Sequence, residues 1–257
     1  MVRSFEYPKK QHNTVKRYND RGTYELGPIH TVVNNSLVVH VSFAPNPDDA
    51  FPAILPMIGV MASYDHPSSS IDEPLDCYLH GYVSSRLMRL ARDSEKGLPV
   101  CIAATKVDGL VLSLTPNSHS YNYRSAVLQG YARPVEDVKE KVWAMEQITN
   151  KVVPSRCQNS RWGPDNVEMT STMILKVNIE TGSGKIRHGE PHDEAKDLDR
   201  EDVTSSTWTG VVPVYETFGD PVAATTNKVK EVPAYISSYV KEATTSNQEQ
   251  ALEAIKE

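Results

Sequence analysis

The side chains best suited to chemistry lie in two short segments, and the first is residues 79–87, LHGYVSSRL. It places His80 at the end of an expected strand, followed by the flexible Gly81, two serines that include Ser85, and Arg86. Backbone N–H groups at a helix start, helped by an arginine, bind phosphate through charge-assisted hydrogen bonds. The segment therefore predicts an anion site. A serine-capped helix with surface arginines is the alternative, and from local pattern alone it is the more common case.

The second segment, residues 119–125, reads HSYNYRS and precedes an apolar strand. His119, Tyr121, Tyr123, Arg124 and Ser125 bring aromatic rings, a cation and hydrogen-bonding groups into seven positions. Such a mixture can hold a flat heteroaromatic ring and its charged tail. The alternative is an aromatic-rich strand entrance with no ligand.

The histidines and cysteines outside these segments do not form a metal-binding motif. His188 and His192 are four residues apart, but Gly189 and Pro191 exclude the helix that would place both on one face. We therefore expect no metal site. His40 and His119 are read either as core residues or as site residues.

The elements that must position the two segments are expected to be about six strands and two internal helices. The apolar run 53–61 is typical of a strand buried on both faces, and 45–49 of a turn. The other predicted strands are a stretch ending at Phe43, 75–80, a hairpin of 100–106 and 110–114 with its turn at 107–109, 124–133 and 173–180.

Apolar residues at helical spacing predict a helix after each of the two segments described above. Leu87, Leu90 and Ala91 predict a helix with Ser84 or Ser85 at its N-cap. A second helix is predicted to start at Pro134 and to bury one side, formed by Val138, Val142, Met145 and Val152. Residues 189–206 are predicted to be irregular, and 232–257 to form one or two helices.

This element order favours a mainly β protein over a doubly wound α/β fold. The sequence contains neither G-x-G-x-x-G after a strand nor G-x-x-x-x-G-K-[ST]. The best match is one β-barrel domain with a few packed helices and a terminal tail.

Composition narrows the class of protein. The formal net charge of −6 argues against a general nucleic-acid-binding surface, and no apolar run approaches the length that spans a bilayer. Three cysteines, Cys77, Cys101 and Cys157, without metal-like spacing suit free thiols in a reducing compartment, so we expect a cytoplasmic protein. Residues 1–22 are basic without an apolar middle, which predicts an extended arm rather than a secretory signal. The arm is expected either to lie on a partner surface or to remain loose.

Taken together and in this order, the segments resemble the pyridoxamine 5′-phosphate oxidase-like family of FMN-binding split barrels, in its flavin-nucleotide-binding branch that includes the nitroimidazole-resistance proteins. The resemblance rests on six sequence segments, which are AILPMIGVM, LHGYVSSRLMRL, ATKVDGLVLS, YRSAVLQGYARPVED, VNIETGSGKIR and STWTGVVPV. The resemblance covers roughly residues 22 to 222, so the expected organisation is an arm at 1–22, a flavin-binding barrel at 23–222 and a helical tail at 223–257.

The resemblance implies a homodimer that binds FMN across its subunit interface, with FAD or haem as alternatives used by related branches. It assigns backbone and side-chain contacts with the flavin ring to Pro56, Met57 and Ile58, and the ribityl chain and phosphate to His80, Gly81, Ser85 and Arg86. It places Arg124 and Ser125 at the strand that enters the site, and it brings Trp208 toward the ring. Leu87 stands where relatives carry a second basic residue, so the phosphate affinity is either lower here or is supplied by Arg89.

The implied activity is a flavin-dependent oxidoreductase acting on a small organic substrate, because the cofactor carries the electron chemistry in such proteins. A non-catalytic flavin carrier is the alternative, and the family's C-terminal pattern for pyridoxal phosphate is not visible. If the protein is an enzyme, His119 and Tyr123 are the predicted proton-relaying residues, since both can exchange a proton near the ring.

Overall fold

The computed structural model describes residues 5–46, 50–161 and 163–256, so residues 1–4 of the predicted arm, part of the predicted turn at 45–49, and residue 257 of the tail lie outside the described residues. Contacts divide the chain into two compact units. Unit one comprises residues 1–105 and 125–185, and unit two comprises 106–124 and 186–257.

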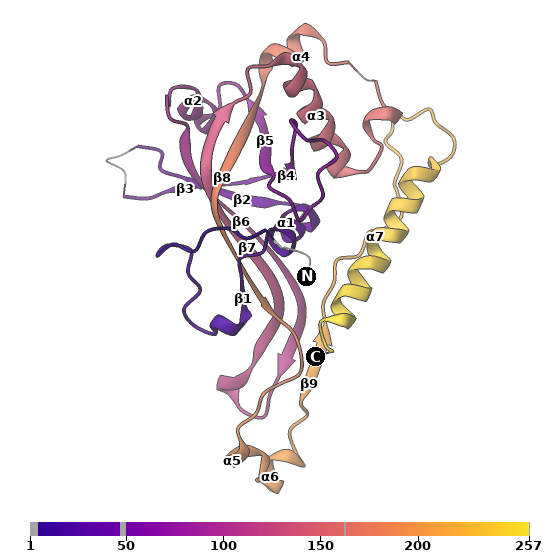
Figure 1. The fold of residues 1–257 in the computed structure, drawn as a ribbon. Helices are drawn as coiled ribbons and strands as arrows, with labels where there is room; N and C mark the ends of the chain where they lie inside the picture. The colour runs from indigo at the N-terminus through magenta and orange to yellow at the C-terminus, as the bar shows by residue number, and fades with distance from the viewer. Residues whose placement is uncertain (1–4, 47–49, 162, 257) are drawn as a thin grey trace. The chain divides into compact units, whose positions relative to one another are not determined.

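The strands form one antiparallel sheet in the order β3-β2-β6-β7-β8-β5-β4, while β1 pairs with β8 and β9 pairs with β6 (Figure 1). The strands are β1 (Gly22–Thr23), β2 (Val39–Phe43), β3 (Ala53–Met57), β4 (Gly59–Ala62), β5 (Asp76–Tyr82), β6 (Leu98–Leu112), β7 (Ser120–Pro134), β8 (Thr172–Arg187) and β9 (Gly210–Pro213).

The helices are α1 (Leu26–Asn35), α2 (Arg86–Arg92), α3 (Val138–Val152), α4 (Asn166–Ser171), α5 (Ala195–Leu198), α6 (Glu201–Thr204) and α7 (Ala234–Glu253), with short 3₁₀ turns η1 (Asn19–Arg21), η2 (Pro116–Ser118) and η3 (Cys157–Asn159). Within the part of the chain that the structure describes, no helix is long and apolar enough to cross a membrane.

The main core of unit one lies between α1 and one face of the sheet. Leu26, Ile29 and Val33 follow the i, i+3, i+7 spacing and are all buried against strand residues such as Val41 and Leu79. The sequence forms a helix here because these apolar residues share one face. Alternation along β2 then turns Val39, Val41 and Phe43 into the same core.

A smaller core in unit one forms where α3 covers β4 and β5 (Figure 1). Tyr78 is fully buried, and its ring meets Trp143 edge-on with 5.3 Å between centroids. The Tyr78 hydroxyl donates to Glu140 at 2.7 Å, and Lys176 Nζ lies 3.1 Å from the same carboxylate. This polar layer fixes the helix against the sheet.

The N-terminal segment packs on unit one instead of remaining loose. Tyr7 is buried, and its hydroxyl hydrogen bonds to His30 Nε2 at 2.6 Å. Asn13 is 4% exposed and donates to Pro8 O and Gly182 O at 3.0 Å each. A Cβ at Gly182 would lie 2.5 Å from the Tyr7 ring, so only glycine allows this close approach.

Unit two is organised around α7. Asn122 is fully buried, and its amide donates to Gly189 O and Ala254 O at 3.0 Å each. The Gly189 N–H donates to the same Ala254 carbonyl at 2.8 Å. At the other end of the helix, the rings of Phe218 and Tyr239 lie 5.4 Å apart. Helix α7 is therefore held within unit two near both of its ends.

Two strand predictions are wrong. The predicted hairpin at 100–114 is instead the single strand β6, because residues 107–109 stay extended, and β9 pairs with Gly109 and its successors. The run 53–61 is two strands, and β3 is exposed at Ile54 and Leu55 because it is the edge of the sheet.

The helix predictions are incomplete in number and wrong in part of their detail. The sequence predicts two internal helices, whereas the described residues also contain α1, α4, α5 and α6. Pro134 ends β7, and α3 begins at Val138, where the Asp137 carboxylate caps two backbone N–H groups. The predicted buried side is wrong at Val138 and Val152, which are exposed, whereas Ala144 and Ile148 face the core. Residues 189–206 contain α5 and α6, and 232–257 contains one long helix.

Candidate functional site

The predicted anion site lies in unit one, where β5 leads into α2. His80 and Gly81 pair with Ile174 and Met173 of β8, so this end of β5 is fixed in the sheet. A Cβ at Gly81 would lie 2.6 Å from Met88 Cε and 3.7 Å from Ser85 Oγ. The glycine thus permits the loop and α2 to fold back onto the strand end.

The polar groups of this loop are free to meet a ligand. His80 Nδ1 is a buried atom with no hydrogen-bond partner among the described residues. Burial lowers the pKa of His80, so the imidazole is neutral near pH 7 and offers one donor and one acceptor. Ser85 is the N-cap residue of α2, but its side chain makes no capping hydrogen bond.

The cations beside this loop also lack partners. Arg86 and Arg89 are exposed, and neither has an ion pair or side-chain hydrogen bond within the described ranges. Arg92, on the same short helix, does pair with Asp93, at 3.2 Å. Arg86 and Arg89 are therefore unpaired cations suited to an anionic group. The unsatisfied His80 Nδ1 is a separate feature of the same segment.

Three further residues predicted for the flavin ring lie at the edge of unit one. Pro56 and Met57 belong to β3, and Ile58 lies between β3 and β4. Pro56 is exposed and pairs with His40 of β2, which is exposed as well. This edge therefore leaves Pro56 uncovered within the chain, with Met57 and Ile58 half-buried.

Ser125, also in unit one, has an internal partner. Its hydroxyl donates to Lys185 O at 3.1 Å, which ties β7 to β8. A hydroxyl retains acceptor lone pairs after donating, so this contact leaves Ser125 able to accept one hydrogen bond.

The remaining predicted residues belong to unit two. Arg124 donates from Nε and Nη2 to the two carboxylate oxygens of Asp108, at 2.8 Å each, and Asp108 is 3% exposed. The geometry is a bidentate pair, which the sequence analysis missed because Asp108 was placed in a turn. Arg124 thus already has a full partner for one side of its guanidinium.

His119, Tyr123 and Trp208 have different surroundings in unit two. His119 is exposed, and its Nδ1 accepts a hydrogen bond from the Ser113 N–H at 3.0 Å, so the ring closes the turn before β7. Tyr123 is half-buried on β7. Trp208 is 67% exposed and lies over Gly210, where a Cβ would come within 2.7 Å of the indole.

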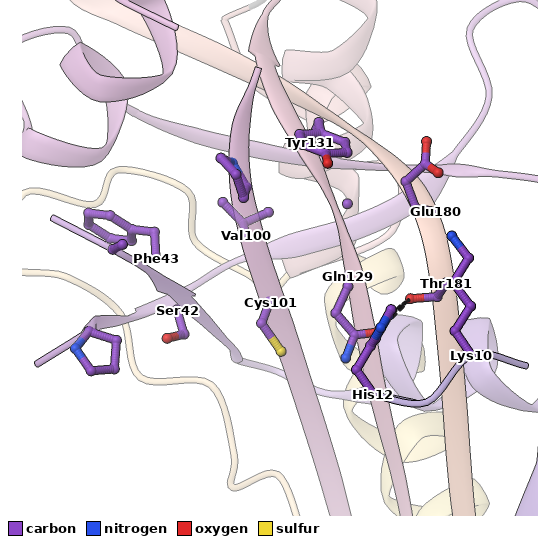
Figure 2. Close-up of a pocket in the computed structure, with 14 residues that line it drawn as sticks. Lys10, His12, Ser42, Phe43, Val100, Cys101, Gln129, Tyr131, Glu180 and Thr181 are labelled. Atoms are coloured by element: carbon purple, nitrogen blue, oxygen red, sulfur yellow. Dashed lines mark hydrogen bonds between the residues drawn. The ribbon is translucent and has the colours of Figure 1, made fainter. Parts of the chain in front are cut away.

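The sequence analysis also missed a cavity in unit one, which Figure 2 shows. It has a volume of about 450 Å³ and lies on the outer side of β2, β6, β7 and β8. Lining side chains include Lys10, His12, Ser42, Cys101, Gln129 and Thr181. Ser42 and Cys101 are cross-strand partners and so share one face of the sheet. None of the predicted site residues lines this cavity.

No metal centre is evident. Across residues 5–46, 50–161 and 163–256, no group of three or more His, Cys, Asp or Glu side chains is placed to hold an ion. His188 and His192 are both exposed.

A comparison with protein-family models decides the family. The model described as "Pyridoxamine 5′-phosphate oxidase" matches residues 27–186, which is more than half of the chain. The chain belongs to this family. The predicted resemblance is therefore confirmed, and the antiparallel sheet with flanking helices is the architecture typical of the family's split barrels.

Solved structures give the same fold. The flavocytochrome Anf3 from Azotobacter vinelandii is 21% identical, with a TM-score of 0.74 over 90% of this chain and 97% of that chain. The FAD and haem binding protein from Mycobacterium smegmatis is 21% identical, with a TM-score of 0.70 over 86% and 97%. A search of the curated proteins finds no match.

A putative 5-nitroimidazole antibiotic resistance protein from Bacteroides thetaiotaomicron is 18% identical and aligns over 62% of this chain and 81% of that chain, with a TM-score of 0.45. The two longer alignments, with the flavocytochrome and with the FAD and haem binding protein, show how much of this chain shares their fold. Both alignments cover more of this chain than the family match, which ends at residue 186. The fold shared with these two proteins therefore includes part of unit two.

Proposed function

We propose that this protein binds a flavin nucleotide and works as a flavin-dependent oxidoreductase. The observation that carries the proposal is the loop from His80 to Arg89 in a chain that belongs to the pyridoxamine 5′-phosphate oxidase family. A buried imidazole nitrogen without a partner costs free energy unless a ligand or water satisfies it. A phosphate at the start of α2 would pair with Arg86 and Arg89, which have no other partner among the described residues.

The chain's own residues divide the work of binding. Arg86 would neutralise the phosphate, Ser85 and His80 would hydrogen bond to it, and Gly81 would let the backbone approach. Pro56, Met57 and Ile58 would contact the ring from the sheet edge, with Arg124, Ser125 and Trp208 completing the set as the resemblance implies. When bound, a flavin would supply the hydride and electron transfer.

His119 and Tyr123 are the proposed proton-relaying residues. His119 Nδ1 accepts the Ser113 N–H, which fixes the neutral tautomer with its proton on Nε2. The ring is exposed, so Nε2 can meet a substrate. Tyr123 offers a hydroxyl on the following strand.

A homodimer is part of this proposal. Ile54 is 59% exposed on the edge strand β3, and Phe51 just before it is 79% exposed. Apolar side chains of this size at a sheet edge are the kind that a second copy covers. Light scattering of the purified protein should give twice the mass of the chain, and a clean monomer would contradict a site shared between subunits.

A flavin together with haem is the second candidate. Two solved proteins that align with at least 86% of this chain are named as a flavocytochrome and as an FAD and haem binding protein. Their alignment includes unit two, which lies mostly outside the family match. This favours FAD over FMN as the flavin if haem is also present.

The cofactor can be identified directly. The purified protein should show visible flavin absorption, and mass spectrometry of the released cofactor separates FMN from FAD. The pyridine haemochrome spectrum reports haem independently of the flavin. Reduction of bound flavin by a nicotinamide cofactor and its reoxidation by substrate would then separate an oxidoreductase from a carrier.

A further inference from the structure

The cavity on the outer side of β2, β6, β7 and β8 has a polar end and an apolar end (Figure 2). At the polar end, His12 of the N-terminal segment reaches Thr181 of β8, beside Gln129 of β7. Phe43 lies at the apolar end (Figure 2), and the lining also includes Pro52 and Pro99. A volume of about 450 Å³ falls in the range of small-molecule sites.

The polar end has a fixed hydrogen-bond direction. The Thr181 hydroxyl is 1% exposed and donates to Gln129 Oε1 at 2.8 Å. Because its one proton is used, Thr181 Oγ1 accepts from His12 Nε2, which lies 3.1 Å away. The relay therefore runs from His12 through Thr181 to the Gln129 carbonyl oxygen.

This direction determines what Gln129 can offer a ligand. Its amide oxygen is held by Thr181, so its NH₂ group is left as a double donor, and no partner for that group is found among the described residues. Lys10 adds a positive charge to the same end, and its ammonium makes no ion pair in the part of the chain that the structure describes. Glu180 also lines the cavity; its carboxylate lies on the side toward which the Lys10 side chain extends and points away from the Gln129 amide (Figure 2).

The surface between the two ends is small and apolar. Cys101 Sγ points into the cavity between the Phe43 end and the Gln129 end (Figure 2). Burial raises the pKa of Cys101, so it is an uncharged thiol that behaves as an apolar contact. A flat apolar group can lie on this part of the sheet.

From these contacts we propose that the cavity binds an aromatic carboxylate, with its ring over Cys101 toward Phe43 and its carboxylate at the Gln129 amide and Lys10. The site is separate from the flavin-binding residues proposed above, since none of them lines it. The recognition is charge-assisted at one end and hydrophobic at the other.

The test is calorimetric titration of the purified protein with three probes of one shape: 2-naphthoate, 2-naphthamide and 2-naphthylmethylamine. We expect 2-naphthoate to bind at least about tenfold more tightly than the amine, whose ammonium only donates, with 2-naphthamide between them because its carbonyl oxygen accepts hydrogen bonds but carries no charge. Equal or tighter binding of the amine, or no binding of any probe, would overturn the proposal.

Variants locate the binding. Gln129→Glu keeps an acceptor for Thr181 and removes the donor, so it should weaken 2-naphthoate about tenfold or more. Lys10→Met should also weaken it, whereas the matched control Lys16→Met, on an exposed lysine outside the cavity, should not. Unchanged affinity in both Gln129→Glu and Lys10→Met would refute the site. If Gln129→Glu does not fold, as judged by circular dichroism, Gln129→Met replaces it with the same expectation.

Discussion

Arg124 and Asp108 form a bidentate ion pair in unit two, with two hydrogen bonds of 2.8 Å and an aspartate side chain that is 4% exposed. The family resemblance gave Arg124 to the cofactor, whereas the structure also gives it a structural partner. The guanidinium has five N–H donors, more than a single carboxylate uses, so the pair leaves donors free for the proposed cofactor contact.

Removing the aspartate should destabilise unit two. Asp108→Ala leaves the half-buried Arg124 without its counter-charge, so the free energy of unfolding should fall by about 3 kcal/mol. Urea denaturation measures the change. The control Asp202→Ala breaks an exposed pair with Arg200 and should cause no measurable loss. Equal stability of Asp108→Ala and wild type would contradict a structural role for the pair.

The parts of the fold that the sequence predicts are those set by interactions between residues close together in the chain. The helix beginning at Arg86 was predictable because Leu87, Leu90 and Ala91 recur at helical spacing, which is a local property. The strand β6 was not, because Asp108–Gly109 reads locally as a turn. Its extended form is held by pairing with Val212 and Pro213, about a hundred residues further on.

The candidate site residues also divide into those predictable from one segment and those brought together only by the fold. The residues of the His80–Arg86 loop could be named from one segment and its family resemblance, since the site is built on consecutive positions. The Arg124–Asp108 pair and the relay from His12 to Gln129 could not be named, because their members come together only through the sheet. No spacing in the sequence signals a contact such as His12 with Thr181.

Arg86 should contribute to FMN affinity through the phosphate. Arg86→Ala is expected to weaken FMN about tenfold or more while changing riboflavin affinity little, because only FMN carries the charge. Fluorescence titration of the flavin-free protein with both ligands gives the two affinities. Arg92→Ala is the matched control on the same helix, since Arg92 already pairs with Asp93. An equal loss for FMN and riboflavin would remove Arg86 from the phosphate site.

His30 should make the fold sensitive to acid. It is fully buried between Tyr7 Oη and Ile71 O, and burial lowers its pKa below that of the unfolded chain. The unfolded state therefore binds a proton first as the pH falls below about 6.5, and the folded state loses stability from there down to its own pKa. His80, whose pKa burial also lowers, acts with the same sign.

Urea denaturation between about pH 7.5 and 5 measures this dependence, at up to ~1.4 kcal/mol per pH unit for each buried histidine. His30→Gln cannot charge, so its stability should fall less steeply with pH than that of the wild type. An identical slope in the variant would show that His30 is not the group responsible.

His119 should affect turnover without affecting cofactor binding. His119→Ala is expected to retain the flavin, because the ring is exposed and its hydrogen bond is to Ser113 N, while the rate of substrate-dependent flavin reoxidation falls. His119→Asn keeps an acceptor for Ser113 and separates loss of the turn from loss of the proton relay. Full turnover in both variants would eliminate His119 and leave Tyr123 to be tested in the same way.

The visible absorption spectrum of the purified protein, after incubation with FMN or FAD and removal of free ligand, tests the central claim most directly. The proposed site predicts a retained flavin spectrum with one flavin for each chain, and its loss for FMN when Arg86 is replaced by alanine. A protein that retains neither flavin at stoichiometric level would contradict the assignment of the His80–Arg89 loop as a flavin-binding site.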